Sequence, residues 1–157
     1  PHNMHLLPAE TAATDMLDSG EIVRMRFEGS LVFANVAFFE EQLQKMLSQT
    51  PNLKVLIIDG VSMREVDASG HEILRESARR LRESGIKVLF TRIRQPVMEV
   101  FKRTHMIELI GTDNFHRNPP DVFRRAWELI SAEKEEQKEE AEDTGQESTT
   151  GPAEETS

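Results

Sequence analysis

The chain has 157 residues, no cysteine and a formal net charge of −9 at pH 7. This length is typical of one domain, and the lack of cysteine excludes disulfides, cysteine-ligated metal centres and a thiol nucleophile. No apolar run in the sequence is long enough to span a bilayer or to form a signal-peptide core. Because the chain begins Pro1-His2-Asn3 and not with methionine, we expect an excised piece of a longer protein.

The negative charge is concentrated at one end. Residues 132–157 contain ten acids and two lysines, whereas residues 1–131 carry a net charge of only −1. The terminal segment is too polar to bury a core, so the sequence predicts a disordered acidic tail there. Residues 1–19 show little periodicity and are interpreted as a linker from a membrane domain, with at most a short strand or turn and a cloning remnant at 1–3. The folded domain is predicted to cover residues 20–131.

The first predicted elements are a hairpin and a helix. Apolar side chains alternate over residues 21–28, which indicates a half-buried strand. Gly29 marks a turn, and the apolar residues 31–33 predict a second strand that pairs with the first. Apolar residues then recur at helical spacing over 37–47, and Pro51 ends that helix.

Strands and helices alternate in the middle of the chain. The uninterrupted apolar run at 55–58 predicts a strand that is covered on both faces. A loop over 59–70 leads into a helix over 70–84, which Gly85 ends, and residues 86–90 predict the next strand.

Two further helices are predicted after the last strand. Gln95-Pro96 opens one and Asn118-Pro119 opens the other, with a short apolar stretch at 109–110 between them. This alternation predicts an α/β domain whose strands pair in parallel through right-handed crossovers.

The loop from Asp59 to Gly70 is the most informative stretch. It follows a buried strand and precedes a helix, and ligands of open α/β sheets gather at the carboxyl ends of strands. Two carboxylates, Asp59 and Asp67, and the hydroxyl of Ser69 are expected near that edge. The alternative is helix capping, either by a capping box of Ser69 with Glu72 or by Asp67.

The sequence gives no positive indication of an enzyme. Ser69 and His71 are two residues apart, and such residues do not face each other on a helix. A glycine-rich phosphate loop is absent. The other histidines show no metal-ligand spacing, so we expect surface or helix-end positions for His2, His5, His105 and His116. We therefore expect no catalytic residue, no metal and no cofactor.

A basic segment follows the loop. Residues 71–103 contain nine bases and four acids, and Arg75, Arg79 and Arg82 recur at i, i+4 and i+7 on one helix face. One interpretation is a solvated face whose charges pair along the helix. The other is a docking face for an acidic protein, a lipid headgroup or the acidic tail of the same chain. Nucleic acid is not expected, because the domain is nearly neutral and lacks an aromatic stacking platform.

The order of elements over residues 20–131, with Asp-Ala-Ser-Gly at 67–70, resembles a STAS domain, the sulfate transporter and anti-sigma factor antagonist family. Gly-Ser-Leu-Val-Phe-Ala-Asn-Val at 29–36 and Gly-Thr-Asp-Asn-Phe at 111–115 are similar to stretches of SulP-type anion transporters. The resemblance implies a mixed sheet of four or five strands, with an N-terminal hairpin and about four helices mostly on one face.

SulP membership implies a non-catalytic regulatory or interaction domain on the cytoplasmic face of a bacterial inner membrane. Its partners would be the transmembrane domain of the same transporter, within a homodimer, and an acidic cytosolic protein. Nucleotide binding has been suggested for STAS domains in general and stays open. The contact surface would be the basic helix and the loop residues Asp59, Ser62, Asp67, Ala68, Ser69 and Gly70.

The other branch of the family, the anti-anti-sigma factors, leaves an alternative. In that branch the motif is Asp-Ser-Ser-Gly, and the serine directly after the aspartate accepts phosphate from a partner kinase. Ala68 stands at this position, which argues against a switch of that kind. The alternative therefore needs phosphate at Ser69 or Ser62.

Overall fold

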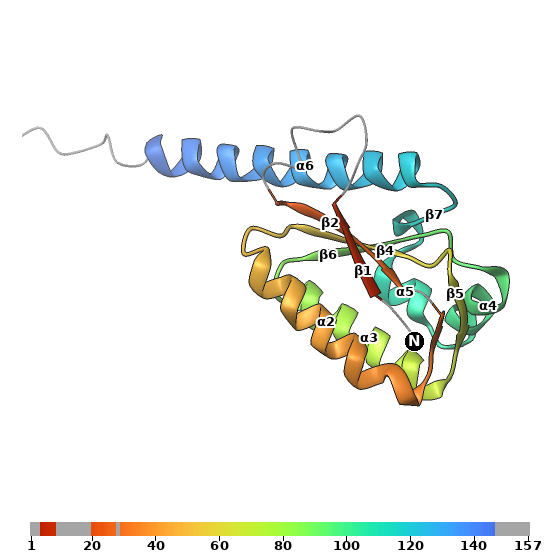
Figure 1. Cartoon of the computed structure of the whole chain (residues 1–157). Coiled ribbons are helices and arrows are strands. Elements are labelled where there is room, and N and C mark those ends of the chain that lie inside the picture. The colour runs from red at the N-terminus through yellow and green to blue at the C-terminus, as the bar shows by residue number, and fades with distance from the viewer. Residues whose placement is uncertain (1–3, 9–19, 28, 147–157) are drawn as a thin grey trace, which may run out of the picture.

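A five-stranded sheet forms the centre of the protein in this computed structural model, which describes residues 4–8, 20–27 and 29–146 (Figure 1). The strand order is β1-β2-β4-β6-β7, in which β1 is antiparallel to β2 and all other neighbours are parallel. The predicted α/β class and mixed sheet are confirmed. The strands are β1 (Met4–Pro8), β2 (Ile22–Phe27), β4 (Val55–Asp59), β6 (Lys87–Thr91) and β7 (Phe115–His116).

Helices cover the two faces of the sheet unequally. Four helices pack on one face, and α6 (Pro119–Gln146) lies alone on the other, as Figure 1 shows. This confirms the predicted placement of most helices on one face. No helix within the described residues is both long and apolar enough to cross a membrane. The four helices are α2 (Val36–Gln49), α3 (Ala68–Glu83), α4 (Gln95–Arg103) and α5 (Met106–Ile110).

Burial on both faces explains the uninterrupted apolar sequence of the central strand β4. All five of its residues are buried. Leu56 and Ile58 belong to the larger core under α2 to α5, whereas Val55 and Ile57 belong to the smaller core under α6. A strand that is covered on both faces has no solvent side, so its apolar residues run without alternation.

The predicted hairpin between residues 21–28 and 31–33 is wrong. β2 pairs with β1 and β4, and β3 (Gly29–Leu31) pairs in parallel with β5 (Met63–Val66) in a separate two-stranded sheet. β5 also occupies part of the predicted loop 59–70. The antiparallel partner of β2 is therefore β1, which comes from the predicted linker.

Burial explains why β3 leaves the main sheet. Gly29 has a φ of +109°, a conformation that favours glycine, and its N–H donates to the carbonyl of Ser62 at 3.2 Å. Two residues later, Leu31 is fully buried in the larger core. A tight hairpin turn would place Leu31 beside β2, but its burial between β5 and α3 stabilises the longer-range pairing.

Each end of the described chain contributes one regular element. Met4–Pro8 form the edge strand β1, within the segment predicted as a linker. Helix α6 includes residues 132–146, for which the sequence predicts disorder. Glu, Lys, Gln and Ala all favour helices, so a helix started by a packed segment can continue through them. Residues 1–3, 9–19 and 147–157 lie outside the described part of the chain. The linker and tail expected there are therefore not tested.

Candidate functional site

Asp59, at the carboxyl end of β4, is fully buried. The Nε of Arg92 lies 3.1 Å from Oδ1, and Nη2 of the same guanidinium binds Oδ2. The N–H of Val61 also donates to Oδ1, and the Nε of Arg24 lies 4.0 Å from Oδ2. These partners occupy the carboxylate, which thereby joins the ends of neighbouring strands.

The segment after β6 holds the loop after β4 in place. Arg92 has a φ of +53°, which is uncommon for a residue with a side chain, and its N–H donates to the carbonyl of His116 at 3.0 Å. The Nε of Arg94 donates to the carbonyl of Val61 at 2.9 Å. The loop that leads into β5 is therefore fixed by two arginines from the adjacent connection.

Asp67 ties the start of α3 to the end of β3. Its Oδ1 accepts the N–H of Gly70 at 2.7 Å, and its Oδ2 accepts the N–H of Phe33 at 3.0 Å. Its own N–H donates to the carbonyl of Leu31 at 3.2 Å. The amides of Gly70 and Phe33 hold the pKa of the Asp67 carboxyl below its usual range, because they bind its charged form.

The capping alternative that invoked Asp67 is confirmed, and the Ser69–Glu72 capping box is wrong. Asp67 is the N-cap of α3, so Ser69 already lies within the first turn and the helix begins at Ala68. The hydrogen bonds of Asp59 go to Val61 and Arg92 and those of Asp67 to Gly70 and Phe33, so each carboxylate already has partners of its own.

Gly70 permits the close approach of β3 to α3. A Cβ at this position would lie 1.9 Å from the carbonyl oxygen of Leu31. The contact is made by backbone, which cannot move aside as a flexible side chain can. We therefore assign Gly70 to packing between β3 and α3, on the same junction that Asp67 closes with hydrogen bonds.

This junction presents an exposed aromatic side chain. Phe33, in the short 3₁₀ helix η1 (Phe33–Asn35), is 77% exposed. It lines a groove of about 590 Å³ between the start of α2 and the first half of α3. The walls of this Phe33 groove are formed by Phe33, Val36, Ser69, Glu72, Ile73, Arg75, Glu76 and Arg79.

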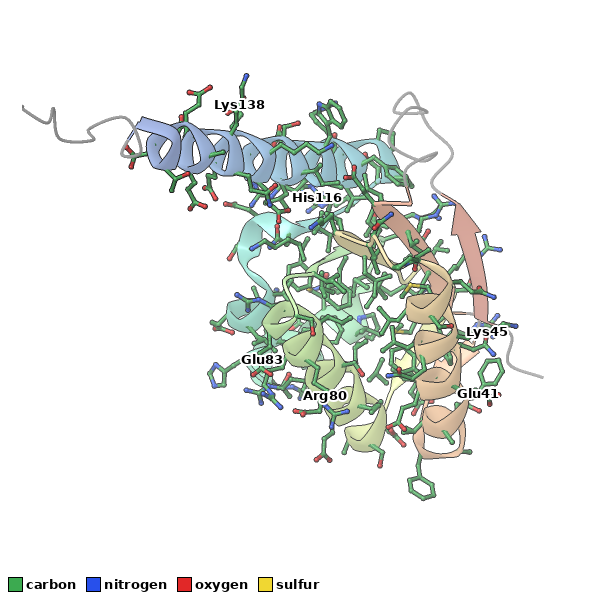
Figure 2. The ribbon with its side chains drawn as sticks, turned by 90° about the vertical axis from the view of Figure 1, so that its left-hand side faces the viewer. Glu41, Lys45, Arg80, Glu83, His116 and Lys138 are labelled. Carbon is green, nitrogen blue, oxygen red and sulfur yellow. The ribbon has the colours of Figure 1, made fainter. Side chains whose placement is uncertain are left out.

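The three predicted arginines have different environments. Arg79 binds Glu76 and Glu83, at 2.5 Å each, so it fits the interpretation of charges paired along a solvated face. Arg75 lines the Phe33 groove and has no ion-pair partner among the described residues. Arg82 lies near the end of α3, in a separate groove with Lys87. Figure 2 shows Arg80 and Glu83 along the outer side of α3.

Sequence reasoning missed His71, which is only 8% exposed and not at the surface. Its Nε2 lies 2.5 Å from the hydroxyl of Thr104, which itself donates to the carbonyl of Val100. Burial and the nearby charge of Arg75 lower the pKa of His71. Its spacing of three and seven residues from Leu74 and Ala78 puts it on the buried face of α3 and could have revealed its burial.

The described residues contain no group of three or more histidines or acids that could hold a metal ion. What the site offers is a concave, partly apolar surface around Phe33, held by backbone contacts and flanked by an unpaired arginine. An arrangement of this kind is suited to contact another molecule through an apolar anchor and a charge.

Comparison with known proteins identifies the family of this chain. The family model described as the STAS domain matches residues 13–137. The chain therefore belongs to the STAS domain family, as its resemblance implied. No curated protein sequence matches it significantly.

Solved structures share the fold. A sulfate transporter family protein from Wolinella succinogenes is 18% identical, with a TM-score of 0.62, over 71% of this chain and 88% of that one. The SulP transporter STAS domain from Vibrio cholerae is 21% identical, with a TM-score of 0.56, over 70% and 83% of the two chains. The murine Slc26a9 anion transporter is 17% identical, with a TM-score of 0.64; the match covers 81% of this chain and 22% of that one.

Replacement of Arg92 by methionine tests the buried ion pair. The variant leaves the buried Asp59 carboxylate without its closest cation, so we expect the free energy of unfolding to fall by about 2–4 kcal/mol. Urea denaturation measures this change. The control Arg94→Met loses one exposed hydrogen bond and should cost at most about 1 kcal/mol. Equal losses in the two variants would contradict the role of Arg92.

Gly70→Ala tests the contact between β3 and α3. The added methyl group overlaps the Leu31 carbonyl, so the two elements must separate, and we expect a loss of about 2–4 kcal/mol in the free energy of unfolding. Gly145→Ala is the matched control, since nothing lies within 4 Å of its added Cβ. The assignment fails if both alanine variants unfold at the same urea concentration.

The lowered pKa of His71 predicts a pH dependence of stability. The unfolded chain binds a proton on His71 more readily than the folded chain does, so the contribution of His71 is fully present well above pH 6.5. It is lost as the pH falls below about 6.5. The measurement is the free energy of unfolding at several pH values for the wild type and His71→Asn. The wild type should lose more stability on acidification, and parallel curves would refute the prediction.

Proposed function

We propose that this chain is the non-catalytic regulatory and interaction domain of a SulP-type secondary anion transporter of the sulfate, bicarbonate or carboxylate class. In this proposal it lies on the cytoplasmic face of a bacterial inner membrane and contacts the transmembrane domain of the same transporter, which is a homodimer. Membership of the STAS family supports the proposal, and so does the shared fold with STAS domains of transporters.

The observation that carries the proposal is the exposed Phe33 beside an unpaired arginine. The Phe33 ring is 77% exposed, so it is available to anchor a partner. The ring stands on a rigid support, because the N–H of Phe33 is bound by Asp67. Val36 and Ile73 extend the apolar surface, and Arg75 adds a charge at its rim. Aromatic and arginine side chains are those that dominate protein contacts.

A nucleotide is a weaker candidate for this surface. Phosphates bind at helix N-termini because the free amides and the helix dipole favour a negative charge. At the start of α3 the carboxylate of Asp67 already occupies that position and accepts the Gly70 amide. A phosphate there would displace or repel this carboxylate, and the chain has no glycine-rich phosphate loop.

The phospho-switch alternative also loses support at this site. Ala68, at the acceptor position, has no hydroxyl. A phosphate on Ser69 would stand beside the Asp67 carboxylate, in the same first turn. We therefore favour a constitutive contact surface over a phosphorylated one.

Phe33→Ala in the transporter that carries this domain tests the proposal. Loss of a contact anchor of this kind weakens a protein interface about tenfold or more. We therefore expect anion uptake into proteoliposomes to fall, with unchanged expression and folding because the side chain is exposed. Arg75→Glu should act in the same direction.

Trp127→Ala is the matched control, because Trp127 is the other exposed large aromatic residue of the described chain and lies on α6, across the sheet. Uptake by this variant should equal that of the wild type. Unaltered uptake in Phe33→Ala, or an equal loss in both variants, would argue against the Phe33 groove as the regulatory surface.

A further inference from the structure

The last turns of α6 are unusually acidic. Residues 132–146 carry seven acids and two lysines, and their side chains are almost all exposed. Two ion pairs connect the start of this segment to the domain, Lys54 with Glu133 at 3.6 Å and Lys134 with Glu21 at 3.4 Å. Beyond Lys134 the described part of the helix makes no ion pair. Figure 2 shows Lys138 pointing away from the sheet.

The charges of this segment oppose its own helical structure. Glu135 and Glu139, Glu136 and Glu140, and Glu139 and Asp143 are like charges at i and i+4, which repel. The acids also gather at the C-terminal end, where the helix dipole is negative. A helical segment that is polar all round gains little stability from packing. A positively charged surface alongside it would remove this repulsion.

Such a surface exists on the other side of the molecule. A groove of about 320 Å³ at the end of α3 is lined by Arg79, Arg82, Glu83, Lys87 and Leu109. Glu83 is already neutralised by Arg79, at 2.5 Å. Arg82 and Lys87 are exposed and have no ion-pair partner among the described residues. The groove therefore offers two free cations.

The two surfaces cannot meet within one chain as described. α6 packs on the face of the sheet opposite to α3, and its last turns continue straight past the sheet (Figure 1). The sequence-based hypothesis that the acidic segment covers the basic helix of its own chain does not hold for residues 132–146. A second copy of the chain has no such restriction.

We propose that the acidic end of α6, residues 135–143, docks into the Arg82–Lys87 groove of a second copy. Each copy offers both surfaces, so the contact can be reciprocal and close into a pair. The attraction is between exposed charges, which makes it weak and strongly dependent on salt. The inference concerns this chain alone and does not depend on the transporter context.

Paramagnetic labelling tests this contact, because the chain has no cysteine of its own. A spin label on Thr144→Cys keeps every acid of the helix. This chain is mixed with an unlabelled, ¹⁵N-enriched copy at about 1 mM, where weak complexes are populated. We expect the amide signals of residues 79–87 in the second copy to lose intensity at low salt. They should recover it at about 1 M salt, where the Debye length is about 3 Å.

Ser48→Cys provides the matched control, since Ser48 is likewise an exposed hydroxyl residue that binds the backbone of its own helix, here α2. Its label should leave residues 79–87 unchanged. Broadening that is equal from both labels, confined to another surface, or absent at low salt would overturn the proposal.

Charge reversal separates the specific contact from general attraction. Arg82→Glu with Lys87→Glu in the ¹⁵N-enriched copy should abolish the broadening, and the amide spectrum of the variant verifies that it is folded. Glu139→Lys with Glu142→Lys in the spin-labelled copy should restore it. If the spin-labelled reversed copy does not broaden the amide signals of the ¹⁵N-enriched reversed copy, the contact is not the one proposed.

Discussion

The carboxylate of Asp67 holds together the two segments on which the proposed contact surface is built. It binds the amides of Gly70 and Phe33, while the N–H of the same residue binds the carbonyl of Leu31. The contact between Gly70 and Leu31 leaves no room for a side chain, so the start of α3 and the end of β3 are locked together by backbone. The residues that line the Phe33 groove lie on α3 or directly after β3 in the chain.

The elements that depend on local pattern could be predicted from the sequence. The uninterrupted run of β4, the helical spacing in α3 and the proline at the start of α4 each report on a few adjacent residues. The partner of β3 could not be predicted, because it depends on a β5 segment more than thirty residues away whose middle is polar and exposed. Asp59 was predicted as part of a site, yet only the position of Arg92 shows that its charge is already used.

Charge is separated between the two faces of the sheet. Unpaired arginine and lysine side chains lie around α3, and the acidic excess lies on the last turns of α6. Inside the domain the pattern is different, because the buried Asp59 carboxylate is matched by the arginines that surround it. The net charge of −9 therefore describes neither face of the sheet. The sequence shows that acids and bases are separated along the chain, but not that they lie on opposite faces.

The hydrogen bond that supports residue 33 uses its main-chain N–H, which donates to the Asp67 carboxylate. Every amino acid except proline carries this N–H. The ring of Phe33 can consequently be exchanged for another side chain without loss of the hydrogen bond that fixes its backbone. Different atoms therefore serve folding and the proposed recognition: the side chain at position 33 can change with a partner, whereas the hydrogen bonds and the close approach beneath it need Asp67 and Gly70.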